Sequence, residues 1–182
     1  MHLLAAKPGV ISDGSIAVDL GQTPGEIVIL SSADTELACL AAAQSRLGPG
    51  APSLRLANLL QLGHNLSVDL YIEKVAQHAR LVILRLLGGS RYWPYGVEQI
   101  SAICRERGIA FAALPGDDQP DPELSAACSV AAEAAHRLWR YCAEGGIENA
   151  HNLLGFAATI IAGLRVRPPP LVPARYRRSR PI

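Results

Sequence analysis

The sequence predicts an α/β protein with an open, doubly wound, mostly parallel sheet of four to five strands and helices on both faces, a flavodoxin-like or Rossmann-like layout. Two observations lead to this prediction. Short apolar runs of strand length alternate with segments whose apolar residues recur at helical spacing. Gly, Pro and Asp clusters separate the two kinds of segment. Parallel strands joined by helices need right-handed crossovers, which place helices on both faces.

Three regions follow from composition. Residues 1–25 are rich in Gly, Pro and Asp and are predicted to be an irregular lead-in, with LLAA as a candidate short strand. Residues 26–164 are predicted to form the α/β domain. Residues 165–182 carry six arginines, five prolines and no acid, so we expect a solvated, disordered tail. The part of the chain ahead of it, residues 1–164, is acidic, since removing those six arginines from the net charge of +1 leaves −5.

The first half of the domain is predicted to hold two strands and two helices. The first strand covers residues 27–30, and the oxygens of Ser31, Ser32 and Asp34 can cap the helix that follows. The second strand covers residues 53–57. Ser67 is the predicted N-cap of the second helix, whose first turns carry Asp69 and Glu73.

The second half begins with a strand over residues 81–86, followed by Gly88 and Gly89. Pro94 is placed early in the next helix, where its missing N–H costs nothing, and Gly108 ends that helix. A fourth strand is predicted over residues 109–114. Two helical patterns, over 122–143 and 147–163, complete the domain.

The candidate ligand site lies where the strands end, because open α/β sheets bind ligands beyond the carboxyl ends of their strands. That rule gathers four segments, namely 31–34, 63–65, 88–95 and 115–118. Gly88 and Gly89 would let the backbone approach a ligand or adopt positive φ, and the alternative for them is a tight strand-to-helix turn.

Aromatic and imidazole side chains stand out in these loops. Tyr92, Trp93 and Tyr95 could stack on a flat macrocycle, contact another domain or pack the loop itself. His64, next to Asn65, could bind cobalt or accept a proton, or its ring could bond to backbone. The predicted ligand-binding set is therefore His64, Asn65, Gly88, Gly89, Tyr92, Trp93 and Tyr95, with no catalytic residue and no metal ligand assigned.

Several activities are disfavoured by the motifs. The four cysteines form no C-x-x-C pair, so we expect free thiols rather than a zinc site. The sequence contains no G-x-x-x-x-G-K-[ST], G-x-S-x-G or G-x-G-x-x-G motif. The acidic domain argues against nucleic acid as a partner. The longest apolar run is too short for a bilayer, so we expect no membrane partner and a cytoplasmic location.

One longer pattern resembles a known family. The stretches ISDGSIAVDLGQTPGEIVILSSADTELACLAAA, LRLANLLQLGHNLSVDLYIEKVAQHA, LVILRLLGGSRYWPYG and NLLGFAATII are similar to the amino-terminal region of CobN-type large subunits of aerobic cobaltochelatases, which in turn are similar to the porphyrin-binding subunit of magnesium chelatase. The resemblance covers most of residues 1–164. It implies that this chain is an amino-terminal fragment of such a subunit.

The resemblance also implies a reaction for the intact assembly, which inserts Co(II) into hydrogenobyrinic acid a,c-diamide with ATP hydrolysis during cobalamin biosynthesis. The implied partners are the remainder of the large subunit, two ATPase-side chelatase subunits, one of them of the AAA+ class, and the corrinoid substrate. Cobalt and ATP belong to that assembly, and no cofactor is assigned to this chain. The fragment alone is expected to be inactive.

Two alternatives from other classes remain open. The first is a flavodoxin-like module that binds a nucleotide or flavin in the strand-end cleft. The second is a structural interaction domain that docks through an apolar helix face made of Leu153, Leu154, Phe156, Ile160 and Ile161.

Overall fold

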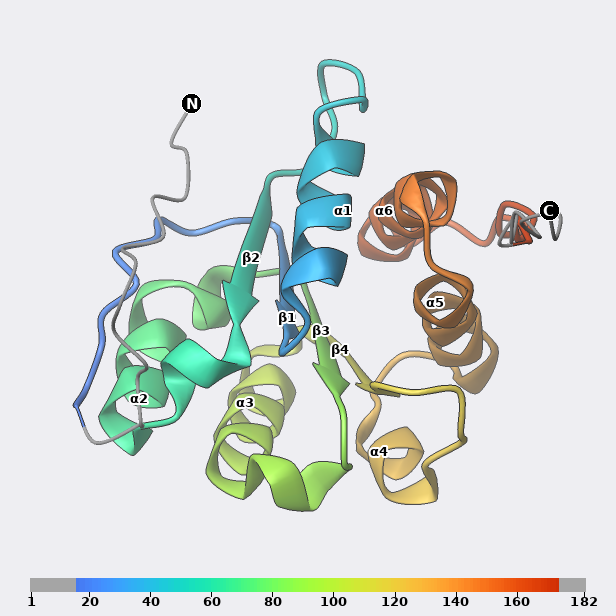
Figure 1. Ribbon diagram of the computed structural model, residues 1–182. Coiled ribbons are helices and arrows are strands. Elements are labelled where there is room, and N and C mark those ends of the chain that lie inside the picture. The colour runs from blue at the N-terminus through green and yellow to red at the C-terminus, as the bar shows by residue number, and fades with distance from the viewer. Residues whose placement is uncertain (1–15, 174–182) are drawn as a thin grey trace, which may run out of the picture.

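The computed structural model describes residues 16–173 and contains a four-stranded parallel sheet (Figure 1). Its strands, in the spatial order β2-β1-β3-β4, are β1 (Ile27–Ser31), β2 (Leu54–Asn58), β3 (Leu81–Leu86) and β4 (Ala110–Pro115). Every residue of β1 and β3 is buried, as continuous apolar runs covered on both faces require. The predicted parallel sheet is confirmed, and its order matches the first four strands of a flavodoxin-like fold.

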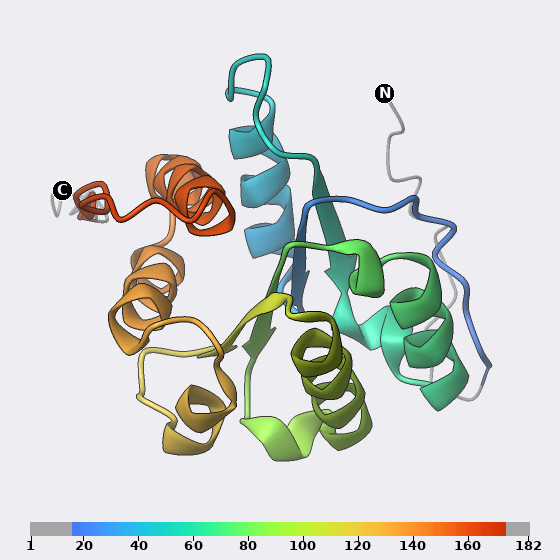
Figure 2. The ribbon, with the colours of Figure 1, turned by 180° about the vertical axis from the view of Figure 1, so that it is seen from behind.

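Helices cover both faces of the sheet (Figures 1 and 2). On one face lie α1 (Asp34–Gln44), α5 (Ala132–Glu144) and α6 (Ile147–Ile161). On the other lie α2 (Asn65–Lys74), α3 (Pro94–Arg107) and α4 (Pro122–Ala127). Three short 3₁₀ turns lie in the connections between strands and helices on this second face, namely η1 (Leu59–Leu62), η2 (Ala76–His78) and η3 (Ser90–Tyr92).

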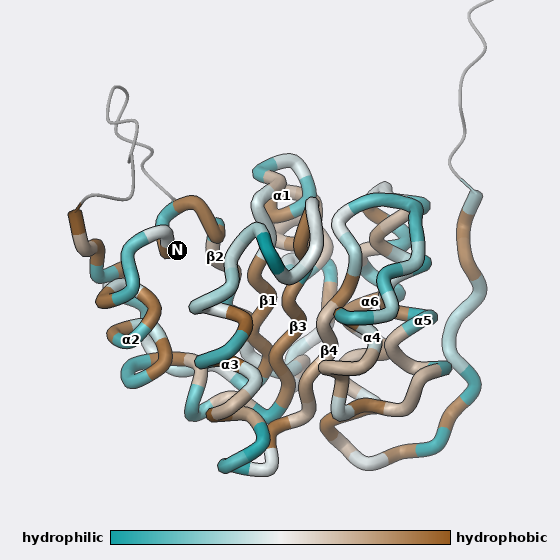
Figure 3. Tube along the Cα trace, turned by 90° about the horizontal axis from the view of Figure 1, so that it is seen from below, coloured by the Kyte–Doolittle hydropathy of each residue, from teal (hydrophilic) through white to brown (hydrophobic). Residues whose placement is uncertain are grey.

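Two hydrophobic cores result, one on each side of the sheet, because neighbouring strand residues point to opposite faces. Ile27 and Ile29 pack against α1, α5 and α6, whereas Val28 and Leu30 pack against α2, α3 and α4. In Figure 3 the hydrophobic strands lie in the middle, between the two helix layers. Within residues 16–173, no helix is both long and apolar enough to span a membrane.

The start of α2 differs from the prediction. The helix begins at Asn65 and is capped by His64, whose Nδ1 accepts a hydrogen bond from the Leu66 N–H at 3.1 Å. Ser67 therefore lies inside the helix, and its hydroxyl accepts instead from the Val18 N–H at 2.7 Å. Because the helix starts earlier than expected, its first turn holds no acid, and the role predicted for Asp69 and Glu73 there is wrong.

The helix predicted over residues 122–143 is two helices, α4 and α5, because the segment between them bonds to the outer edge of β4. The N–H groups of Ser129 and Val130 both donate to the Phe111 carbonyl, and the Ser129 hydroxyl accepts from the Phe111 N–H. The Cys128 thiol accepts from the Ala113 N–H at 3.2 Å. Side chains and loop backbone thus occupy the positions that a fifth strand would use.

The two flanking segments behave differently. Residues 16–25 contain no helix or strand, as predicted for the lead-in, and Lys74 pairs with Asp19 there; the candidate strand LLAA lies outside the described residues. Residues 169–172 differ from the solvated tail we expected, because α5 and α6 hold them through hydrogen bonds. Residues 174–182 of the tail lie outside the described part of the chain.

Candidate functional site

A cavity of about 420 Å³ lies at the carboxyl ends of β1 and β3. This is where the strand order reverses, the position at which open α/β sheets bind ligands. Hydroxyls of Ser31, Ser32 and Thr35 line one side, where β1 passes into α1. The opposite walls come from α5 and α6 and are mostly apolar, including Leu153.

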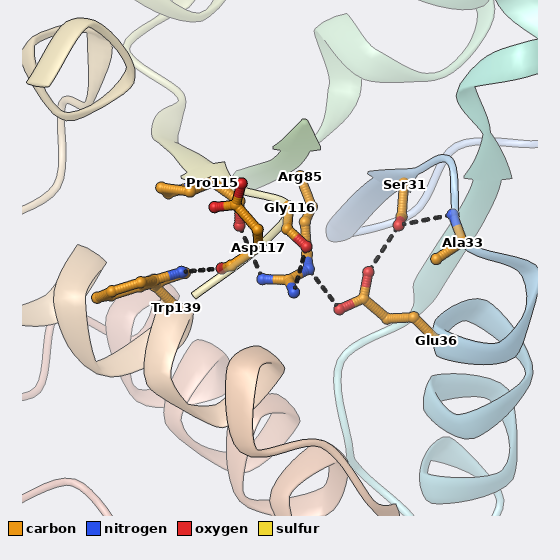
Figure 4. A network of polar contacts seen from close by, with 8 residues as sticks. All are labelled: Ser31, Ala33, Glu36, Arg85, Pro115, Gly116, Asp117 and Trp139. Carbon is orange, nitrogen blue, oxygen red and sulfur yellow. Dashed lines mark hydrogen bonds and ion pairs between the residues drawn. The ribbon is translucent and has the colours of Figure 1, made fainter. Parts of the chain in front are cut away.

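The polar centre of the cavity is an ion pair between Arg85 of β3 and Glu36 of α1 (Figure 4). The Arg85 Nε lies 2.7 Å from the Glu36 Oε1, and the two side chains are only 10% and 17% exposed. The second carboxylate oxygen of Glu36 accepts the Ser31 hydroxyl at 2.6 Å. Buried charges are tolerated when they are paired and hydrogen-bonded, which explains how one arginine fits into an otherwise apolar strand.

The same guanidinium also fixes the loop after β4. Its Nη1 donates to the Pro115 carbonyl at 2.9 Å and its Nη2 to the Gly116 carbonyl at 3.0 Å. Gly116 is needed there, because a Cβ would lie 2.5 Å from the Leu87 backbone nitrogen. On the far side of the loop, the Trp139 indole N–H donates to the Asp117 carbonyl at 2.9 Å. Arg85 therefore ties together β1, α1, β3 and the end of β4.

Two thiols face this cavity, Cys39 from α1 and Cys142 from α5. Burial, and after it the nearby Glu36 carboxylate, raise the pKa of both thiols above the ordinary value. Thiols with raised pKa values stay protonated at neutral pH, and the thiol form is a poor nucleophile and metal ligand. Since Arg85 and Glu36 neutralise each other, the arrangement suits binding of a ligand through hydrogen bonds and apolar contacts rather than nucleophilic chemistry.

None of the seven residues predicted to bind a ligand lines this cavity. Gly88 and Gly89 follow β3 with φ of 88° and 75°, so they supply the positive φ that the turn needs. Tyr92 is 53% exposed beside them. Leu87, just before the glycines, is the cavity residue closest to this loop in sequence.

The other predicted residues gather on the opposite face of the sheet. Trp93 is 7% exposed, and its indole N–H donates to the Leu62 carbonyl at 3.0 Å. Tyr95 donates its hydroxyl to Asp69 at 2.8 Å. These two bonds join the start of α3 to η1 and α2, and His64 and Asn65 lie between the two bonded segments, at the beginning of α2. Within the described residues, no group of three or more His, Cys, Asp and Glu side chains could hold a metal ion.

Sequence reasoning missed Arg85 and Glu36. A signal for Arg85 was present, because it is the one charged residue in the run LVILRLL, and a buried charge needs a partner. Nothing in the sequence pointed to Glu36 as that partner, since the pairing depends on how α1 sits over the sheet. The strand-end rule did place Ser31, Ser32 and Gly116 at the site.

No protein-family model matches the chain. The chain is 47% identical over 173 residues to the aerobic cobaltochelatase subunit CobN of a Sinorhizobium species, covering 95% of this chain and 13% of that subunit. It is 54% identical over 151 residues to the aerobic cobaltochelatase subunit CobN of Pseudomonas aeruginosa, covering 82% of this chain and 12% of that subunit.

A solved structure agrees with these relatives. The catalytic subunit of cobaltochelatase from Mycobacterium tuberculosis superimposes with a TM-score of 0.62 and 29% sequence identity, covering 81% of this chain and 11% of that one. The chain thus spans only 12% to 13% of the length of the curated relatives. The resemblance expected from the sequence is confirmed, and the chain is homologous to one segment of the aerobic cobaltochelatase subunit CobN.

Proposed function

We propose that the chain is the amino-terminal α/β domain of a cobaltochelatase large subunit and that it serves the assembly as a scaffold. The observation that carries this proposal is the 47% identity over 95% of the chain. In the intact assembly, the reaction would be ATP-dependent insertion of Co(II) into hydrogenobyrinic acid a,c-diamide. The partners would be the rest of the large subunit and two further chelatase subunits, one of the AAA+ class, in the cytoplasm.

The polar groups of the site support a scaffolding role. Arg85 and Glu36 bond to each other and to backbone or hydroxyl groups, so neither offers a free charge for a metal or a proton transfer. The cavity thiols have raised pKa values. We therefore propose that cobalt insertion needs groups from the other parts of the assembly, since catalysis requires reacting groups held close together in the right orientation.

An exposed apolar rim supports contact with the rest of the large subunit. We define this rim as Leu60, Leu66, Leu87 and Tyr92, which are between 48% and 56% exposed and lie in segments that follow or adjoin the carboxyl ends of β2 and β3. The alternative face, around Leu153, Leu154 and Phe156, is buried against α1 and α5 and is already used inside the domain. Ligand binding by the seven predicted loop residues stays a prediction.

A cobalt-insertion assay tests the proposal. The 182-residue chain, mixed with the two ATPase-side subunits, corrinoid, Co(II) and ATP, should give no insertion, whereas the complete Pseudomonas subunit in its place should. Insertion by the chain alone would contradict the scaffold assignment.

A chimera tests the domain's place in the assembly. This chain would replace the 151-residue matching segment of the Pseudomonas subunit. We expect insertion within several-fold of the parent rate. An unrelated flavodoxin-type domain at the same position is the matched control, and equal activity of the two chimeras would show that this domain contributes nothing specific.

The cavity supports a second candidate function, binding of a small molecule such as a nucleotide or flavin. Its volume, about 420 Å³, falls within the usual range of ligand pockets. Titration calorimetry with FMN, nucleotides and a corrinoid separates the candidates. Saturable binding of FMN alone would favour a flavodoxin-like binding module. Binding of corrinoid alone would favour direct contact between this cavity and the chelatase substrate.

A further inference from the structure

The segment after α6 turns back along the outer side of α5 and α6 (Figure 2). It contains the sequence Pro168-Pro169-Pro170-Leu171-Val172. Three side chains form hydrogen bonds with its backbone, namely Tyr141 on α5 and Asn149 and Asn152 on α6. Nothing in the proposed chelatase role accounts for this arrangement.

Asn149 makes the most specific of these contacts. Its side-chain amide is 1% exposed. The Nδ2 group donates to the Val172 carbonyl at 2.7 Å and to the Gly145 carbonyl at 2.7 Å, while the Oδ1 accepts from the Val172 N–H at 2.9 Å. A buried amide that matches both the N–H and the carbonyl of a single residue recognises extended backbone, whatever its side chain.

The proline carbonyls receive the remaining donors. The Tyr141 hydroxyl donates to the Pro169 carbonyl, and the Asn152 amide donates to the Pro170 carbonyl at 3.1 Å. Proline has no N–H, and a run of prolines adopts an extended helix without internal hydrogen bonds, so its carbonyls need outside donors. Such a run is also extended before it docks, which lowers the entropy cost of binding.

The side chain of Leu171 adds an apolar anchor. It is half-buried and packs against the core formed by α1, α5 and α6. Other proteins bind proline-rich segments in grooves lined by aromatic side chains, and here Tyr141 is an aromatic residue that contacts the segment.

We propose that the α5–α6 face is a recognition site for an extended proline-rich peptide, occupied in this chain by its own residues 168–172. The covalent link keeps the site filled, because a tethered ligand acts at a high effective concentration. The proposal does not depend on the chelatase assignment, so either can fail without the other.

Hydrogen exchange on the intact chain gives the first test. The Val172 amide should exchange much more slowly than an unstructured amide, and Asn149→Ala should remove that protection. Asn152→Ala is the matched control, since it deletes only the bond to Pro170 and should leave most of the protection at Val172. A Val172 amide that exchanges at the unstructured rate in the unmodified chain would overturn the proposal.

Binding in trans gives the second test. A full-length variant with Gly and Ser in place of residues 168–172 should bind a fluorescent peptide of residues 165–173 saturably, measured by anisotropy. The unmodified chain should bind it far more weakly, because its own segment competes. If the variant does not fold, judged by circular dichroism, the exchange experiment decides alone.

A third experiment tests whether peptide binding depends on Asn149 and on the Val172 N–H. Asn149→Ala in the Gly/Ser variant should weaken peptide binding by about 4- to 100-fold, because it removes both bonds to Val172 and each hydrogen bond contributes roughly a factor of 2 to 10. A peptide with Val172→Pro, which lacks the N–H bonded to Asn149, should bind more weakly than the parent peptide. Equal affinity of the Asn149→Ala and parent proteins would refute recognition by this residue.

Discussion

The aromatic residue that stands out in the sequence and the charged pair that forms the cavity lie on opposite sides of the sheet. On the side of α2 and α3, the aromatic residue that stands out in the sequence, Trp93, is buried and bonds to the Leu62 carbonyl. On the side of α1, α5 and α6, an inconspicuous arginine and glutamate form the centre of a cavity. A rare residue in a loop can therefore mark packing, whereas a charge inside a strand marks the site.

Removing the buried arginine should have the largest effect. Arg85→Met leaves the Glu36 carboxylate without its partner and frees two carbonyls, so we expect the free energy of unfolding to fall by about 3–5 kcal/mol. Urea unfolding measures this loss. Arg46→Met breaks the exposed pair with Glu148 and should cost at most about 1 kcal/mol. Equal losses in the two variants would show that the cavity pair is not energetically distinct from a surface pair.

On the packed side, Trp93→Phe should cost about 1–3 kcal/mol, since the Leu62 carbonyl then has no donor in a buried place. Tyr92→Phe is the control on the same loop. Because Tyr92 is 53% exposed, its change should stay within about 0.5 kcal/mol. A larger effect at Tyr92 than at Trp93 would reverse the roles that the structure gives to these two residues.

A buried thiol on the side of α2 and α3 should make the stability of the protein depend on pH. Burial raises the pKa of the Cys104 thiol to about 12, from a usual value of 9.0. The folded state therefore keeps a proton that the unfolded state loses, so this contribution to stability is complete below about pH 9 and is lost as the pH rises toward 12.

Between pH 8 and pH 10 we expect a loss of about 1–2 kcal/mol from this thiol. Urea unfolding at the two pH values, on the parent and on Cys104→Ala, isolates it. Cys128 and Cys142 have raised pKa values with the same sign and remain in both proteins. An unchanged slope in Cys104→Ala would contradict the prediction.

The smallest effect on stability is expected at His64. Variants of this residue show whether its imidazole binds metal or only caps α2. His64→Ala should cost about 0.5–1 kcal/mol through loss of the cap on α2, and His64→Asn should recover it, because Asn is a strong N-cap. In the chimeric chelatase, His64→Asn should leave the rate of cobalt insertion unchanged. A large loss of insertion with normal stability would instead support cobalt binding by this imidazole.

The sequence predicted the strands well, since β3 matches its predicted bounds, β1 is one residue longer than predicted, and β2 and β4 are each shifted by one residue. Continuous apolar runs between turn residues are a local signal. Pro94 and Gly108 bound α3 for equally local reasons, namely a helix start and a left-handed cap.

The features that the sequence did not predict have a common physical cause, which is that they depend on contacts between residues far apart in the chain. The break between α4 and α5 depends on Ser129 bonding to Phe111, and the Glu36–Arg85 pair joins residues 49 positions apart. The hydrogen bonds that hold the segment after α6 likewise come from tertiary contacts, with Asn149 and Val172 23 positions apart. Periodicity and composition carry no information about such contacts. The site could therefore be placed at the strand ends, and the charge of Arg85 within an apolar run was a signal, but its partner Glu36 could not be named.

The outer edge of β4 is already hydrogen-bonded within the molecule, which limits how the protein can associate. An exposed strand edge is a template for pairing with another chain, and such pairing leads to aggregation or to sheets that extend across molecules. Here, Cys128, Ser129 and Val130 occupy the outward-facing groups of Phe111 and Ala113, and Arg85 takes the Pro115 carbonyl. A sheet continued from one molecule into the next is therefore blocked along β4, and contacts on this flank must form through side chains.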